Sequence, residues 1–153
     1  MTQAMFPLPE PMRTALAAAR AAALAGEVPV GAVVMRGGHV LAIEANAPRR
    51  LNDPTAHAEM LAIRAASVAL GHDRLEDCDL WVTLEPCAMC AGAIAHARIR
   101  RLYYGAPDQK GGAVEHGPRL FGQSTCHHRP DVYAGIGEGE AAALLRNFFA
   151  ARR

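Results

Sequence analysis

The chain has 153 residues, of which 16 are Lys or Arg and 15 are Asp or Glu, so its formal net charge at pH 7 is only +1. This length is typical of one globular unit, and we expect residues 1–153 to form a single domain. The balanced charge excludes a uniformly basic nucleic-acid-binding surface, so any basic contact must be a local patch. No stretch reaches the roughly 20 apolar residues that span a bilayer, which favours a cytoplasmic protein without a membrane partner.

The first half of the chain predicts a helix, a β-hairpin and a second helix. Apolar residues at helical spacing, among them Met12 and Leu16, indicate that the first helix is amphipathic. Two short β-branched runs separated by Gly37-Gly38 are typical of a hairpin. The polar segment that follows is expected to be irregular, and Asp53 or Thr55 can cap the next helix. In chain order these elements are helix 12–26, strand 30–35, strand 40–45, irregular segment 48–54 and a helix ending at about Leu70.

The second half alternates strands with helices and contains one long loop. In chain order its elements are strand 80–84, a helix opened by Glu85-Pro86, strand 99–105, loop 106–126, strand 131–136 and helix 138–150. Because strands alternate with helices along the whole chain, we predict an α/β sandwich with a mixed sheet of five strands. A loop of about twenty residues is unusually long for a compact domain, so we expect it to be functional.

Two short motifs of this sequence indicate its function. His57-Ala58-Glu59 and Pro86-Cys87-Ala88-Met89-Cys90 each fall in the first turn of a predicted helix. Catalytic zinc sites typically have three protein ligands and an open position for water, and His57, Cys87 and Cys90 supply that number. Glu59 is left over as a carboxylate that can reach the water. The combined pattern H-x-E…P-C-x-x-C is typical of zinc-dependent base deaminases.

The expected position of both motifs at helix N-termini favours this chemistry. Free backbone N–H groups at a helix start lower the pKa of a thiol, so Cys87 and Cys90 are expected to bind zinc as thiolates. Two thiolates cancel the charge of the zinc ion and leave its water less acidic than on a three-histidine site. A nearby base is therefore needed. We expect Glu59 to take a proton from the water and deliver it to the departing ammonia, in a hydrolytic deamination.

A structural zinc site with four protein ligands is the competing interpretation. Spare Cys and His residues could supply the fourth ligand, and these are Cys78, His96, Cys126, His127 and His128. Adjacent residues in an extended chain point to opposite sides, so neighbours of this kind rarely bind one ion together. We expect Cys78 and Cys126 to pack as small hydrophobic residues. The ligand number and the free Glu59 favour the catalytic site.

Beyond the motifs, nearly the whole chain resembles one protein family. The segment TLEPCAMC (83–90) and the G-A-x-D-x-K loop (105–110) are its most specific parts. On these residues the chain resembles the cytidine deaminase superfamily, and within it the bacterial tRNA-specific adenosine deaminases. The matching positions are 27–32, Asn46, 53–59, 83–93, 105–106, Asp108, Lys110, 112–113, 142–145 and 148–149. The sequence departs from the family pattern between Glu115 and Pro130.

The resemblance implies a cytidine-deaminase-like three-layer α/β/α sandwich with one Zn²⁺ per chain, held by His57, Cys87 and Cys90, and with Glu59 as the proton shuttle. It implies a hydrolase that converts adenosine to inosine at the wobble position of a tRNA anticodon stem-loop. It also implies a homodimer whose RNA-binding groove includes residues of both subunits. Asp108 is placed near the RNA backbone by this resemblance. The residues placed around the flipped nucleotide are Asn46, Ala58, Leu84, Glu85 and Pro86.

Two other functions stay open on the residues alone. A deaminase of a free base or nucleoside, such as guanine, cytosine or cytidine, would use the same zinc chemistry. A catalytically silent RNA-binding subunit would have no need of Glu59. Among the remaining residues, we expect the arginine pairs 49–50 and 100–101 on solvated faces or against RNA phosphates. Phe148 and Phe149 are expected in the core, and His116 at the surface or in a cap.

Overall fold

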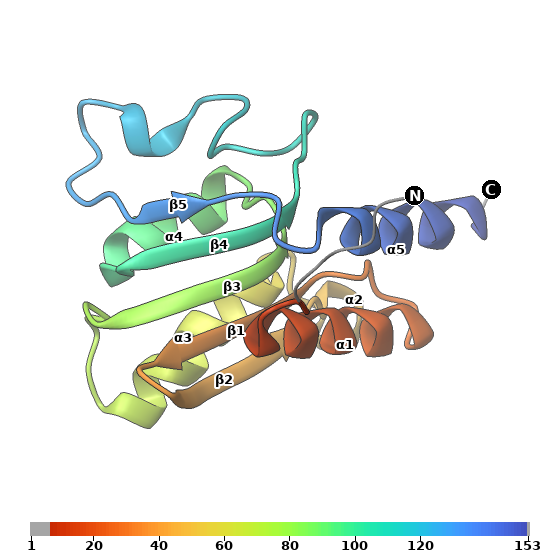
Figure 1. The fold of residues 1–153 in the computed structure, drawn as a ribbon, viewed down its shortest axis with the longest axis horizontal. Helices are drawn as coiled ribbons and strands as arrows, with labels where there is room; N and C mark the ends of the chain where they lie inside the picture. The colour runs from red at the N-terminus through yellow and green to blue at the C-terminus, as the bar shows by residue number, and fades with distance from the viewer. Residues whose placement is uncertain (1–6, 153) are drawn as a thin grey trace.

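The computed structural model describes residues 7–152 and contains one five-stranded sheet between two layers of helices (Figure 1). The strands are β1 (Gly31–Arg36), β2 (His39–Ala45), β3 (Cys78–Leu84), β4 (Arg101–Ala106) and β5 (Asp131–Tyr133). The helices are α1 (Glu10–Leu24), α2 (Pro48–Leu51), α3 (Ala58–Leu70), α4 (Ala88–Ala97) and α5 (Glu138–Ala150), with a short 3-10 helix η1 (Leu120–Gly122). The predicted three-layer α/β/α sandwich with a mixed sheet is confirmed.

The order of the strands in the sheet decides where the two motifs meet. The order is β2-β1-β3-β4-β5. β1 pairs antiparallel with β2 and with β3, whereas β3, β4 and β5 run parallel to one another. Parallel neighbours end at the same edge of a sheet, which is where open α/β sheets bind their ligands. The turn after β3, which carries Cys87, therefore emerges beside the loop that follows β4.

Each face of the sheet is covered by two helices, α3 and α4 on one face and α1 and α5 on the other (Figure 1). The larger core lies under α3 and α4 and includes Val82 and Ile94. A second core lies under α1 and includes Leu16. A Cβ atom on Gly31 would lie 1.9 Å from the carbonyl oxygen of Ala15, so only glycine lets α1 pack this closely on β1. Among the helices of residues 7–152, none combines the length and the apolar character needed to cross a membrane.

The short helix α2 lies in the segment for which the sequence predicts an irregular chain. Its backbone N–H groups have a remote partner, because the buried carboxylate of Glu27 accepts hydrogen bonds from Arg49 N (3.3 Å) and Arg50 N (2.8 Å). Pro48 occupies the helix start, where its missing N–H costs nothing. The prediction was wrong because the stabilising carboxylate lies 22 and 23 residues earlier in the chain, beyond the reach of a local pattern.

Further boundaries differ from the predicted ones, among them the start of α3, whose N-cap is His57 and not Asp53 or Thr55, the start of α4 and the end of β5. Helix α4 begins at Ala88 and not at the Glu85-Pro86 pair, because Cys87 has extended backbone angles (φ −74°, ψ 177°) and is the N-cap. Strand β5 ends at Tyr133, earlier than predicted, and Gly135 then takes a left-handed conformation (φ 80°) that interrupts an extended chain. The long connection between β4 and β5 spans residues 107–130 and contains η1.

A stack of three aromatic rings fixes the three-residue edge strand β5. Tyr133 stacks on Tyr103 with ring centroids 4.9 Å apart, and Tyr103 stacks on Trp81 at 3.8 Å. The stack follows the register of the sheet, in which Tyr103 pairs with Trp81 on one side and with Tyr133 on the other. Such pairs are worth about 0.5–1.5 kcal/mol each beyond their buried area. The long loop 107–130 therefore returns to a fixed point on the sheet.

Candidate active site

The two sequence motifs meet at the N-termini of α3 and α4. His57 is the N-cap of α3, Cys87 is the N-cap of α4, and Cys90 lies in the first turn of α4. His57 Nδ1 lies 3.6 Å from Cys87 Sγ and 3.5 Å from Cys90 Sγ. Within residues 7–152 these are the only His, Cys, Asp or Glu side chains that form a ligand group of three, with all ligand atoms within 4.8 Å of one another.

These separations fit a zinc ion in tetrahedral geometry. Zn–S bonds of about 2.3 Å and Zn–N bonds of about 2.0–2.1 Å, opened to the tetrahedral angle, place nitrogen and sulfur about 3.6 Å apart. The competing four-ligand site would need one more residue, and in the described part of the chain no further ligand joins the group. Cys126 Sγ instead donates to the carbonyl oxygen of His128 (3.1 Å), and Cys78 is buried at the start of β3.

The charge states of the two thiols depend on each other. The adjacent Cys90 thiol, together with His57, lowers the pKa of Cys87 to about 4 although burial opposes this shift. In turn, Cys87 and burial raise the pKa of Cys90 above its ordinary value. Two thiolates this close repel each other, and a divalent cation between them is what allows both to be deprotonated. The ligand atoms of His57, Cys87 and Cys90 therefore suit a zinc ion, which would stabilise both thiolates.

Glu59 lies in the first turn of α3, and only 4% of the residue is exposed. Burial raises the pKa of its carboxyl to about 7, and the neighbouring Cys87 adds to the shift. A carboxyl whose pKa is close to neutral can both accept and donate a proton during catalysis. Glu59 does not belong to the group of ligand atoms found among residues 7–152. Its surroundings are those of an acid–base group.

Asn46, directly after β2, ties that strand to the first motif. Its Oδ1 accepts a hydrogen bond of 2.8 Å from the backbone N–H of Ala58, the first residue of α3. The bond satisfies one of the free N–H groups at the helix start and fixes the backbone next to His57. Hydrogen bonds among residues 7–152 use only the oxygen of this side chain, so the Nδ2 amide group remains as a donor.

The six residues expected to bind substrate are not equally accessible. Three are buried and three are partly exposed. The buried residues are Ala58, Glu85 and Pro86, and the partly exposed residues are Asn46, Leu84 and Asp108. Partly exposed side chains can offer polar or apolar contact to a nucleotide, whereas buried ones can contribute only backbone or support.

Glu85 differs most from its expected role, because its side chain turns into the protein. Its side chain is 0% exposed, and among residues 7–152 all of its hydrogen-bond partners lie in the loop after β4, including His116 Nδ1 at 2.7 Å. Burial alone raises the pKa of this carboxyl, but the N–H donors of Asp108 and of other loop residues outweigh burial and hold the pKa below its ordinary value. His116 was expected at the surface or in a cap. No local pattern points to the pair, since its members are 31 positions apart.

Asp108 closes a tight turn of the same loop. Its Oδ1 accepts hydrogen bonds from the backbone N–H groups of Lys110 (3.1 Å) and Gly111 (2.9 Å). Among the described residues these bonds occupy Oδ1 alone, so the second carboxylate oxygen is still an acceptor. The turn thus holds one acceptor in a fixed direction on a partly exposed loop.

The two arginine pairs lie in different regions. Arg100 binds Asp79 through two hydrogen bonds of 3.1 Å, and Arg101 lies 3.9 Å from the same carboxylate. This cluster is at the starts of β3 and β4, the opposite end of the strands from the metal-ligand turn. Arg49 and Arg50 are exposed on α2, which begins two residues after Asn46. Only the α2 pair is therefore placed to meet a substrate of this site.

A cavity of about 350 Å³ opens between α2 and the last turn of α5, and Arg49 contributes to its lining. Phe149 also lines it and is 47% exposed, which differs from the predicted core position. Phe148 is buried as predicted, and the Arg152 guanidinium lies 3.5 Å from the centre of its ring. Cationic groups beside an exposed aromatic ring are typical of surfaces that bind single-stranded nucleic acid.

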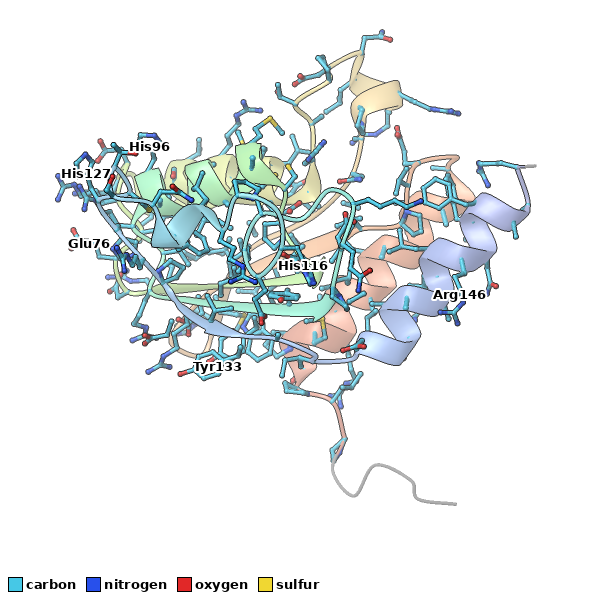
Figure 2. The ribbon with its side chains drawn as sticks, turned by 90° about the horizontal axis from the view of Figure 1, so that it is seen from above. Glu76, His96, His116, His127, Tyr133 and Arg146 are labelled. Atoms are coloured by element: carbon cyan, nitrogen blue, oxygen red, sulfur yellow. The ribbon has the colours of Figure 1, made fainter. Side chains whose placement is uncertain are left out.

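A second cavity of about 260 Å³ lies at the carboxyl end of α4, the end away from Cys87 and Cys90. Its lining includes His96 and His127, which lie together at the end of the molecule away from Arg146 on α5 (Figure 2). This cavity adds no residue to the metal-ligand group.

The fold and the ligand set define a zinc-dependent deaminase. Residues 8–106, more than half of the chain, match the family described as the cytidine and deoxycytidylate deaminase zinc-binding region, and the chain belongs to that family. A more distant member of this fold is the guanine deaminase of Nitrosomonas europaea. Its structure matches with a TM-score of 0.76 at 26% sequence identity and covers 96% of this chain and 87% of that one.

Closer relatives identify the branch of this family. The chain is 59% identical to the tRNA-specific adenosine deaminase of Agrobacterium fabrum over 142 residues, which is 93% of each protein. It is 45% identical to the protein of the same name from Rickettsia bellii, over 90% of this chain and 97% of that one. A structure from a study of A-to-I editing by tRNA:A34 deaminases at the wobble position matches with a TM-score of 0.87 at 59% identity, and covers 88% of this chain and 98% of that one. The chain is a member of the tRNA-specific adenosine deaminases.

Proposed function

We propose that this protein is a hydrolase that converts adenosine to inosine at the wobble position of a tRNA anticodon loop. The observation that carries the proposal is the tetrahedral spacing of His57, Cys87 and Cys90 beside the buried carboxyl group of Glu59. This arrangement performs hydrolytic deamination of a base, and membership of the tRNA-specific branch supports adenosine in tRNA as the substrate. We also propose that residues 1–153 act as one catalytic domain in the cytoplasm, where tRNA is found.

Each residue of the site has a distinct task in the proposed reaction. His57, Cys87 and Cys90 would hold one zinc ion, which would supply Lewis-acid activation of the attacking water. Glu59 accepts one proton from the attacking water and delivers it to the ring nitrogen, and it then carries the second proton, from the hydroxyl group formed on the ring carbon, to the amino group that leaves as ammonia. The pKa of Glu59, raised by burial to about 7, suits both transfers. The helix N-termini that carry His57 and Cys87 hold the ligands rigidly, so the reacting groups keep their alignment.

The partly exposed residues around the site support binding of a flipped nucleotide. In the proposed complex, Asn46 donates from Nδ2 to an acceptor of the base, and Leu84 contacts the ring. In the same proposed complex, backbone atoms of Ala58 and Pro86 form the rest of the surface around the flipped base. Asp108 offers its second carboxylate oxygen to a ribose 2′-hydroxyl, the group that distinguishes RNA from DNA. An adenosine that is already unpaired in a loop is the least costly to flip into such a site.

The cavity between α2 and α5 supports contact with the nucleotides that flank the target. Arg49 and Arg152 can neutralise phosphates there, and the exposed ring of Phe149 can stack on a base. Such contacts make RNA binding sensitive to salt in spite of the small net charge.

We further propose that the active form is a homodimer. One chain of this size offers a small surface to a folded RNA loop, and closed two-fold dimers are the commonest assemblies. Light scattering at micromolar concentration should give twice the mass of one chain. A purely monomeric protein with full activity would contradict this part of the proposal.

The proposed substrate is tested by assaying four molecules side by side. These are an RNA anticodon stem-loop with adenosine at the wobble position, its DNA copy, free guanine and free cytidine. We expect the RNA stem-loop to be deaminated much faster than the other three. The fold is shared with a guanine deaminase, so rapid turnover of guanine without turnover of the stem-loop would assign the protein to free bases instead.

A further inference from the structure

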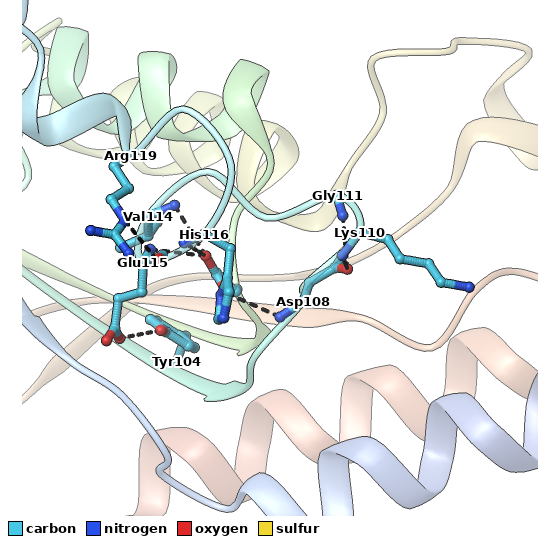
Figure 3. A network of polar contacts seen from close by, with 9 residues as sticks. Tyr104, Asp108, Lys110, Gly111, Val114, Glu115, His116 and Arg119 are labelled. Atoms are coloured by element: carbon cyan, nitrogen blue, oxygen red, sulfur yellow. Dashed lines mark hydrogen bonds and ion pairs between the residues drawn. The ribbon is translucent and has the colours of Figure 1, made fainter.

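The loop that follows β4 is held to the metal-ligand turn by one buried carboxylate. Glu85 lies directly after β3, two positions before Cys87, and its side chain is 0% exposed. Its partners lie in the segment from Asp108 to His116. Figure 3 labels these partners, which are Asp108, Val114, Glu115 and His116. We call this set of contacts the Glu85 clamp.

Five hydrogen bonds make up the Glu85 clamp. Oε1 accepts from the backbone N–H of Asp108 (3.0 Å) and from His116 Nδ1 (2.7 Å). Oε2 accepts from the backbone N–H groups of Val114 (3.1 Å), Glu115 (2.9 Å) and His116 (3.1 Å). A carboxylate has about four lone-pair positions, so these five bonds leave it no position to accept a further hydrogen bond. Glu85 has neither the exposure nor the free acceptor that a contact with a nucleotide would require.

The loop fits closely around this carboxylate. A Cβ atom on Gly112 would lie 2.4 Å from the carbonyl oxygen of Asp108 and 2.5 Å from Glu85 Cδ, so this position has no room for a side chain. The backbone N–H of Ala113 donates to the carbonyl oxygen of Pro86 (2.9 Å), directly before Cys87. The loop is thus fixed to the two residues that precede the metal ligand.

A further contact anchors the outer side of the loop to the sheet. The hydroxyl group of Tyr104, on β4, donates to the carboxylate of Glu115 (Figure 3). Tyr104 is only 2% exposed, whereas Glu115 lies at the surface. The segment from Asp108 to His116 is therefore held both by Glu85, directly after β3, and by Tyr104 on β4.

We infer that Glu85 is a positioning residue for the substrate-binding loop, and that His116 is the side-chain partner through which this chain completes the clamp. Glu85 sets the distance between Asp108 and the zinc ligands, and it does so from the same turn that carries Cys87. His116 belongs to the segment in which the sequence departs from its family pattern. This inference rests on the proposed function only where it concerns RNA, because the clamp itself is a property of the loop.

The first test is Glu85→Gln, assayed on the RNA stem-loop. The amide keeps the shape of the side chain but turns one acceptor into a donor, which then faces N–H groups of the loop. We expect KM to rise about tenfold or more while kcat stays within about twofold and zinc content is unchanged, because the loop contains neither a metal ligand nor the acid–base residue. The matched control is Glu76→Gln, which removes the same charge at an exposed position before the start of β3.

The second test uses His116, whose side chain is 33% exposed and can be replaced without opening the core. His116→Ala removes one of the five donors and should raise KM by about threefold. His116→Asn keeps a donor close to the position of Nδ1 and should restore KM to that of the parent. This pair remains informative if Glu85→Gln does not fold.

The third test needs no substrate and separates the clamp from the proposed function. Amide hydrogen exchange of the zinc-loaded protein should show that the N–H groups of Asp108, Val114 and Glu115 are protected. In Glu85→Gln their exchange should be at least about tenfold faster, with little change in helix α3. Loss of protection together with inactivity of the parent on the stem-loop would retain the clamp and reject the proposed substrate.

Three results would overturn the inference. A fall in kcat at constant KM would make Glu85 part of the reaction and not of loop positioning. Loss of zinc from Glu85→Gln would mean that Glu85 supports the ligand turn instead. Unchanged exchange and unchanged KM would mean that the loop keeps its position without the clamp.

Discussion

The metal-ligand turns and the loop from Asp108 to His116 border the same site, but they obtain their positions in different ways. His57 and Cys87 cap two helices, and Cys90 follows within one helical turn. The helices α3 and α4, which pack on the sheet, fix the positions of these residues. The loop has no regular structure between Asp108 and His116 and depends on the Glu85 clamp. Each metal-ligand motif is held by the start of its own helix, whereas the loop is held by a side chain from another segment of the chain.

This difference separates the chemistry from the recognition of substrate. Groups that bind the metal and move the proton need accurate and constant geometry, which helix ends supply. A loop that meets a large substrate needs shape and accessible polar atoms, and it can vary without disturbing the reaction centre. Changes at the metal ligands or at Glu59 should therefore abolish turnover or reduce it strongly. Changes in the loop should mainly affect KM.

The largest effect is expected from Cys87→Ala. Removal of one of three protein ligands should release most of the zinc and reduce deamination to background, while circular dichroism still reports a folded protein. Metal analysis of the purified variant measures this directly, with about one zinc per chain expected in the parent. Full zinc occupancy in Cys87→Ala would show that the ligand set is assigned wrongly.

Glu59→Ala should have the next largest effect. The carboxyl group is buried and lies outside the group of ligand atoms, so the variant should keep its zinc and its affinity for RNA. Loss of the acid–base group should lower kcat by about 10²–10⁴-fold. Single-turnover kinetics on the stem-loop, together with metal analysis, checks both statements. A variant within about tenfold of the parent would mean that another group moves the proton.

Gly112→Ala should have a moderate effect that is confined to recognition. The added Cβ would lie 2.4 Å from the Asp108 carbonyl oxygen, so the loop must move away from Glu85. We expect KM for the stem-loop to rise about tenfold with zinc retained and with kcat nearly constant. Gly122→Ala is the matched control in the same connection, because its Cβ would have no neighbour within 4 Å. Equal KM values for both variants would contradict the idea that the loop needs its close fit.

Cys126→Ala should have the smallest effect. Its thiol donates to the His128 carbonyl oxygen, and the residue does not belong to the ligand group found among residues 7–152. Zinc content, kcat and KM should all equal those of the parent. Metal analysis and deamination assays, as for Cys87→Ala, measure these quantities. Loss of zinc from Cys126→Ala would instead support a structural zinc site with four protein ligands.

Much of the fold could be predicted because local periodicity reports burial. Alternating strands and helices indicated the layered sheet, and the apolar spacing of α1 was confirmed. The features that were predicted wrongly depend on residues far away in the sequence. Helix α2 needs the carboxylate of Glu27, and the exposed position of Phe149 depends on how α5 lies on the sheet.

The sequence by itself predicted the candidate metal ligands and the candidate acid–base residue, because each motif lies at a helix start and its internal spacing fixes how its own residues lie. The tertiary structure brings the two motifs together, since His57 and Cys87 are 30 positions apart and meet only through the packing of α3 and α4 on the sheet. Only the tertiary structure decided the roles of Glu85 and His116. Their 31-residue separation leaves no local pattern, and a buried carboxylate must find its donors wherever the fold brings them. A residue type and its spacing can predict the groups that one motif supplies within a helical turn, whereas a contact between separate segments depends on the packing of the whole sheet.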